Sequence, residues 1–135
     1  MLLGHHDIVN FLLYIRERDL MISGSFDREL RLWNMSKYQC VTLIQGIHCT
    51  DINSLYQIDD NRVIVGGHNT IYIVNINQFV VEKTIEDSSL GDILSFLKLR
   101  DNKTILCGSS SITFAIYDMT TGKYKINNMR NISTL

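Results

Sequence analysis

Apolar and polar residues alternate in short runs along this chain, and the same order of runs occurs three times. Each repeat begins with an acidic residue followed by isoleucine: Asp7-Ile8, Asp51-Ile52 and Asp92-Ile93. A second apolar run follows a polar turn and ends in glycine. We align Gly24, Gly67 and Gly108, which recur at a nearly constant spacing. Self-similarity at a period of this size is typical of repeat proteins.

Each repeat is predicted to contain four short strands. The third apolar runs lie at 30–34, 71–75 and 114–118, and the fourth runs at 39–44, 79–85 and 124–128. The first run alone is ambiguous, because Ile8, Phe11 and Ile15 also fit one face of a helix. The other two repeats favour strands, because polar pairs at 60–61 and 101–102 keep their runs short. The predicted units are 5–46, 47–87 and 88–129.

The composition also favours strands. The chain has 135 residues, of which 34 are β-branched, one is Ala and none is Pro. β-Branched residues favour strands and Ala favours helices, so the predicted fold class is all-β. The net charge of −1 gives no electrostatic support for binding nucleic acid or a membrane surface. The N-terminal residues do not resemble a signal peptide, and three Cys suggest reduced thiols. We expect a cytoplasmic protein, with the nucleus as the alternative.

The first repeat carries a more specific pattern. Gly4-His5 precedes the first strand, Ser23 and Asp27 flank the turn after the second, and Trp33-Asn34 ends the third. This pattern resembles the WD-repeat family of β-propellers, with Trp-Asn where Trp-Asp is usual, and the resemblance covers the whole chain. The other repeats are degenerate. Repeat two has His48 before its first strand and Val74 in place of Trp, and repeat three has Tyr117-Asp118.

The resemblance implies a structural role for four side chains. In that family such residues form a hydrogen-bonded chain, here with Asp27 accepting from His5, and with Ser23 between His5 and the Trp33 indole. The set superficially resembles a catalytic triad, but no nucleophile elbow is present. Cys40, His48 and Cys49 lack a second ligand pair for zinc. We therefore expect no enzymatic activity, no metal and no cofactor.

Three repeats are too few for a closed propeller, which has four to eight blades. The sequence therefore predicts an incomplete ring unless other chains complete it. Three interpretations remain. The favoured one is a fragment of a longer propeller. The chain alternatively forms half of a six-bladed homo-oligomer, or is completed or capped by another protein.

The resemblance implies a protein–protein interaction scaffold that binds proteins or peptides. The alternatives are a structural subunit of a larger assembly and, less favoured, part of a propeller enzyme. In the family, partners often bind at the end of the blades where the first strands begin. We call the corresponding positions the strand-end face: Ile8, Asn10, Phe26, Asp51, Asn53, Asp92 and Leu94. Phe26 is the most informative of them, because it is an aromatic residue in a polar turn.

Overall fold

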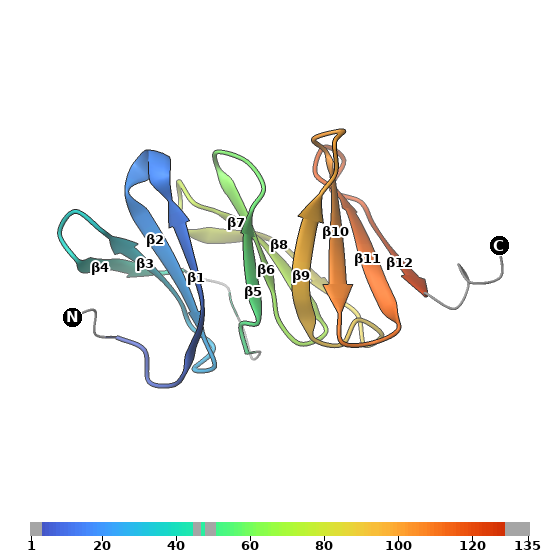
Figure 1. Ribbon diagram of the computed structural model, residues 1–135, viewed down its shortest axis with the longest axis horizontal. Helices are drawn as coiled ribbons and strands as arrows, with labels where there is room; N and C mark the ends of the chain where they lie inside the picture. The colour runs from blue at the N-terminus through green and yellow to red at the C-terminus, as the bar shows by residue number, and fades with distance from the viewer. Residues whose placement is uncertain (1–3, 45–46, 48–50, 129–135) are drawn as a thin grey trace.

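The computed structural model describes residues 4–44, 47 and 51–128, whose strands form three antiparallel sheets of four strands each (Figure 1). Sheet 1 contains β1 (Val9–Ile15), β2 (Leu20–Ser25), β3 (Leu30–Asn34) and β4 (Gln39–Leu43). Sheet 2 contains β5 (Ser54–Gln57), β6 (Arg62–Gly66), β7 (Thr70–Asn75) and β8 (Val80–Glu86). Sheet 3 contains β9 (Ile93–Lys98), β10 (Thr104–Ser109), β11 (Thr113–Asp118) and β12 (Tyr124–Asn128). The predicted all-β class is confirmed.

The ambiguous first run is a strand. β1 pairs with β2 along its whole length, and the short 3₁₀ helix η1 (Arg16–Arg18) connects them. Asp19 follows with a φ of 49°, a left-handed conformation that ends η1 and starts β2. Pairing with β2 therefore shows that residues 9–15 form a strand, which the spacing of their apolar residues alone did not decide. No helix in the described part of the chain is long and apolar enough to cross a membrane.

The strand register corrects one alignment made from the sequence. Gly24 pairs with Leu30, and Gly108 pairs with Phe114 at the same position of sheet 3. The residue at this position of sheet 2 is Gly66, paired with Ile71, rather than Gly67. With Gly66 in place of Gly67, the three glycines are evenly spaced along the chain. Two adjacent glycines made the sequence alignment ambiguous, and hydrogen-bond pairing resolves it.

A second correction concerns the start of the first strands. Val9 pairs with Ser25 and a bulge follows before the next pair, and Ile93 pairs with Ser109 and is likewise followed by a bulge. Val9, and not Ile8, therefore occupies the position of Ile93. Both strands carry the bulge at the same position, so the one-residue difference comes from the Asp-Ile pair, which lies one position earlier in the first repeat than in the third.

The core lies between neighbouring sheets. The first cluster packs sheet 1 against sheet 2 and includes Ile22, Leu32, Val65 and Tyr72, which are all essentially inaccessible to solvent. The second packs sheet 2 against sheet 3 and includes Ile64, Ile73, Ile105 and Cys107. Because side chains alternate between the two faces of a strand, sheet 2 contributes one face to each cluster.

Within residues 4–44, 47 and 51–128, sheets 1 and 3 each have one face that packs against no other sheet. They lie at opposite ends of the molecule with sheet 2 between them (Figure 1). In the region that the structure describes, no strand pairing joins sheet 3 to sheet 1, so the ring is open. The outer face of sheet 1 carries Leu12 and Tyr14, and that of sheet 3 carries Leu97; all three are exposed.

Candidate functional site

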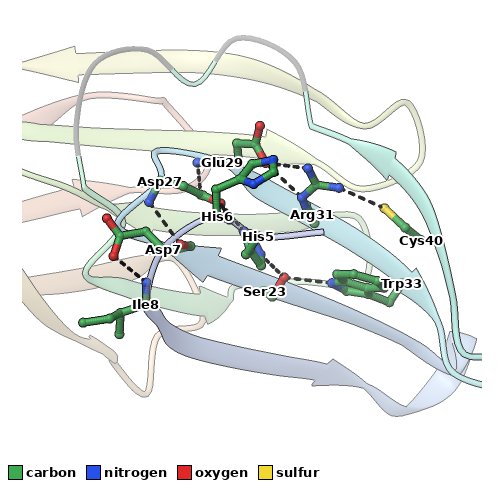
Figure 2. Close-up of polar contacts among 11 residues, drawn as sticks. His5, His6, Asp7, Ile8, Ser23, Asp27, Glu29, Arg31, Trp33 and Cys40 are labelled. Atoms are coloured by element: carbon green, nitrogen blue, oxygen red, sulfur yellow. Dashed lines mark hydrogen bonds and ion pairs between the residues drawn. The ribbon is translucent and has the colours of Figure 1, made fainter. Parts of the chain in front are cut away.

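Four side chains of sheet 1 form a continuous chain of hydrogen bonds (Figure 2). His5 precedes β1, Ser23 lies in β2, Asp27 in the turn after β2, and Trp33 in β3. His5 Nδ1 lies 2.8 Å from Asp27 Oδ2, and His5 Nε2 lies 2.6 Å from Ser23 Oγ. The Trp33 indole N–H donates to Ser23 Oγ at 2.8 Å. The structure therefore brings together all four residues selected from the sequence.

The directions of these bonds follow from the donors. The ionised Asp27 carboxylate can only accept, so His5 carries a proton on Nδ1 and donates it to Asp27. A histidine protonated on Nδ1 alone accepts at Nε2 from the Ser23 hydroxyl, whose oxygen accepts the Trp33 N–H. The backbone N–H groups of His6 and Glu29 also donate to the Asp27 carboxylate, each at 2.9 Å. Every polar group in the chain thus has a partner.

Asp27 is held in its charged form. Burial opposes ionisation, but the hydrogen bonds from the His6 N–H, the His5 ring and the Glu29 N–H outweigh it, so the pKa of Asp27 lies below its ordinary value. The His5 and Asp27 side chains are only 5% and 7% exposed. A buried carboxylate with several donors ties the segment before β1 to the turn after β2.

The geometry of this set does not favour nucleophilic catalysis. Ser23 is 2% exposed, and its oxygen lies between the His5 and Trp33 ring nitrogens. A nucleophile needs access to a substrate and an oxyanion-binding position beside it. The hydrogen bonds among these four side chains satisfy their buried polar groups and link three segments of sheet 1.

The same neighbourhood contains ligand types suited to a metal. His5, Asp27 and Glu29 each offer one ligand atom within 4.8 Å of the others. Both His5 nitrogens already have hydrogen-bond partners, and Glu29 Oε2 accepts from Arg31 Nη2 at 2.7 Å. A metal ion would have to replace these bonds. Of the Cys40, His48 and Cys49 set considered from the sequence, the last two lie outside the described residues.

The third repeat contains a hydroxyl network that the sequence analysis missed. Ser111, aligned with Asp27, has its Oγ 2.6 Å from Thr113 Oγ1 and 3.3 Å from the Ser89 carbonyl oxygen. Thr113 Oγ1 donates to the same Ser89 carbonyl at 2.7 Å. Hydroxyl groups thus link the segment before β9 to the turn after β10. The run of serines after Gly108 is the signal in the sequence that could have found this network.

The positions of the strand-end face lie where β1, β5 and β9 begin. Ile8, Phe26 and Leu94 are exposed, at 63%, 37% and 54%. The Phe26 N–H donates to the Ile8 carbonyl oxygen at 3.0 Å, which places these two residues side by side. Asp51 is exposed, whereas Asn10 and Asn53 are partly buried.

Two contacts join neighbouring sheets along this face, one made by the residue after Asp51 and one by the Asp92 side chain. The N–H of Ile52, which follows Asp51, donates to the Ser25 carbonyl oxygen of sheet 1 at 3.4 Å. The Asp92 carboxylate lies 2.7 Å from His68 Nδ1 in sheet 2. The strand-end face therefore extends across the junctions between sheets.

A cleft of about 260 Å³ opens on the outer face of sheet 1 beside the hydrogen-bonded chain. Its walls are both polar and apolar. They are formed by Gly4, His5, Asp7, Val9, Leu12, Met21, Ser23 and Trp33. No residue of the strand-end face lines this cleft, so the two surfaces are distinct.

Comparison with known proteins identifies the fold. No family model matches the sequence, and no curated protein matches it. Among solved structures, the crystal structure of the WD40 β-propeller domain of Doa1 is similar to this chain, with a TM-score of 0.78 and 19% sequence identity. The match covers 94% of this chain and 43% of the Doa1 chain. The match thus spans less than half of the length of that chain, and the three sheets of this protein have the fold of β-propeller blades.

Proposed function

We propose that this chain is a non-catalytic module that binds proteins or peptides through the strand-end face. The observation that carries the proposal is Phe26, which is exposed at a turn beside the more exposed Ile8. Aromatic side chains held at a surface often contribute most of the affinity of an interface. The propeller fold supports the proposal by analogy, since fold alone does not determine function.

The turn that carries Phe26 is held firmly. The Asp27 N–H donates to Ser25 Oγ at 3.0 Å, and the Arg28 N–H donates to the Ser25 carbonyl oxygen at 3.2 Å. Asp27 itself belongs to the hydrogen-bonded chain of sheet 1. A side chain presented on a preorganised turn loses little conformational freedom when it binds a partner.

The charge of this face favours a basic partner. Asp51 and Asp92 stand at the start of sheets 2 and 3, on the same end of the molecule as Phe26. Carboxylates around an apolar anchor attract Lys and Arg and disfavour acidic segments. We therefore propose a peptide with an apolar residue for Phe26 and Ile8 and with basic residues beside it.

The test starts with a displayed library of short peptides selected on the full chain. A recovered peptide containing Lys or Arg is then measured by fluorescence anisotropy against the parent chain and Phe26→Ala. We expect about a tenfold weaker affinity for the variant, equivalent to about 1.4 kcal/mol, with an unchanged melting temperature. Val41→Ala is the matched control, because Val41 is also exposed but lies on β4.

Two outcomes would contradict this function. If Phe26→Ala lowers the melting temperature and leaves peptide affinity intact, Phe26 packs on its own blade and the strand-end face is not the binding surface. If only acidic peptides are recovered, the proposed charge preference is wrong.

A further inference from the structure

His68 lies in the turn between β6 and β7 and contacts Asp92 of the strand-end face. His68 Nδ1 lies 2.7 Å from Asp92 Oδ1, and the main chains of the two residues form an isolated β-bridge. Both side chains reach solvent, at 63% and 47% exposed. This contact joins the turn of sheet 2 to the start of sheet 3 at a place that a partner on the strand-end face can reach.

The other ring nitrogen of His68 faces Asn69. Asn69 Nδ2 lies 3.3 Å from His68 Nε2, and the Gly91 N–H donates to Asn69 Oδ1 at 2.7 Å. Because the Gly91 N–H can only donate, the amide oxygen of Asn69 faces Gly91 and its NH2 group faces the histidine. The Asn69 N–H also donates to the Gly91 carbonyl oxygen at 2.8 Å, which fixes this arrangement. We call Asp92, His68, Asn69 and Gly91 the junction chain.

The directions of these bonds suit a neutral histidine. An ionised Asp92 can only accept, so His68 carries its proton on Nδ1 and accepts at Nε2 from Asn69. A second proton, on Nε2, would point at the NH2 group of Asn69. Turning this amide over would instead place its NH2 group against the Gly91 N–H. Protonated His68 therefore keeps its contact with Asp92 and loses its contact with Asn69.

The charged groups around His68 are acidic. Asp92 comes from the segment before β9, and Glu86 and Asp87, at the end of β8 and just after it, line a hollow of about 340 Å³ together with the residue after His68. Hydrogen bonds from Ser89 lower the pKa of Asp87, so this carboxylate is charged wherever histidine titrates. The turn after β10 contains no charged residue. Among the described residues 51–53, 67–69, 86–92 and 109–112 there is no Lys or Arg, and the acidic residues are Asp51, Glu86, Asp87 and Asp92.

We propose, building on the function proposed above, that His68 makes the binding of a basic partner depend on pH. The strand-end face binds this partner when His68 is neutral and releases it when His68 is protonated. The added proton places a positive charge among the carboxylates that attract Lys and Arg, and like charges across an interface repel. Histidine changes its charge between about pH 5 and pH 8, so mild acidification is enough to weaken binding.

The first measurement follows the junction chain in the full chain without a partner. In NMR spectra recorded between about pH 5 and pH 8, the His68 ring, the Asn69 NH2 group and the Gly91 N–H should titrate together. His68→Gln should abolish the titration of the other two groups. His6→Gln is the matched control, because His6 is also exposed, and should leave it unchanged. In Asn69→Asp the midpoint of the His68 titration should rise, because the new carboxylate accepts from a protonated Nε2.

The second measurement uses a labelled peptide recovered by the selection described above, chosen to contain Lys or Arg and no residue that titrates near neutrality. Fluorescence anisotropy should give an affinity about threefold weaker at about pH 5.5 than at about pH 7.5. His68→Gln should bind with the same affinity at both pH values, whereas His6→Gln should keep the dependence of the parent chain. The same peptide with Gln in place of its basic residues should show no dependence on pH.

Three results would overturn this inference. One is a parent affinity that is equal at the two pH values, and another is a pH dependence that persists in His68→Gln. The third is a titration of the Gly91 N–H that is unchanged in His68→Gln, because another group would then cause it. Failure of the proposed function is a separate result, in which Phe26→Ala leaves peptide affinity intact. The NMR titration needs no peptide, so it tests the junction chain in either case.

Discussion

The Asp27 carboxylate joins the segment before β1 to the turn after β2, because its two oxygens accept hydrogen bonds from His5, His6 and Glu29. The Oγ of Ser111, its counterpart in sheet 3, contacts hydroxyl and carbonyl oxygens and accepts one backbone N–H, that of Thr113 at 3.2 Å. Loss of a buried acceptor leaves its donors unsatisfied, whereas loss of a partly exposed hydroxyl leaves groups that water can reach.

Asp27→Ala should therefore destabilise the protein by roughly 1–3 kcal/mol, and Ser111→Ala by less. The denaturant midpoints of the two variants measure the difference. Equal losses would mean that the hydrogen-bonded chain of sheet 1 contributes no special stability.

The pH dependence provides the control for this prediction. The pKa of Asp27 is lowered in the folded protein, so its contribution is present above the ordinary value of 3.8 and is lost as the pH falls through the lower folded value. The stability difference between the parent chain and Asp27→Ala should thus be complete at neutral pH and shrink in acid. A difference that persists unchanged well below pH 3.8 would point to lost packing instead of lost charge.

The hydrogen-bonded residues could be selected from the sequence because they match the WD-repeat pattern, in which each of these positions carries a particular polar group in a strand or turn. His5, Ser23 and Trp33 have few substitutes for those bonds. The hydroxyl network around Ser111 could not be selected in this way, because serine and threonine occur in many turns and their partners here are backbone carbonyl groups.

At the scale of strands and sheets, Gly24 lies against Ile52 of the next sheet and Gly66 against Ile93, and this repeated contact is the feature that sequence could not resolve. The number and order of strands followed from apolar runs and polar turns. The choice between Gly66 and Gly67, and between Ile8 and Val9, depended on the strand register. Two adjacent residues of the same type fit an apolar pattern equally well, and only hydrogen-bond pairing separates them.

This contact predicts energetic coupling between Gly24 and Ile52. Gly24→Ala should cost roughly 1–3 kcal/mol, because the added methyl group meets the Ile52 side chain. In an Ile52→Ala background the same change should cost less, because the nearest obstructing atom, Ile52 Cγ2, is gone and only Cβ remains, at 3.1 Å. A double-mutant cycle from urea unfolding gives the coupling energy.

Ile93→Ala is the matched background, since it removes the equivalent isoleucine from the other junction. There the cost of Gly24→Ala should be the same as in the parent chain. Equal costs of Gly24→Ala in all three backgrounds would show that sheet 2 does not pack on Gly24.

On the scale of the whole molecule, each sheet contacts only its neighbours, so the two clusters are separate cores joined through sheet 2. In such an array stability is a sum of units and junctions. Among the described residues, no other sheet packs against the outer faces of sheets 1 and 3.

Cys107 is buried in the core between sheets 2 and 3, so the rate at which its thiol is labelled measures how often these two sheets separate. Burial raises the pKa of this thiol to about 12, so it reacts with an alkylating reagent only when sheets 2 and 3 separate. In a chain with Cys40→Ser and Cys49→Ser, the labelling rate of Cys107 should rise less steeply with urea than the rate of global unfolding, because only one junction must open. Identical urea slopes would mean that the three sheets open as one cooperative unit.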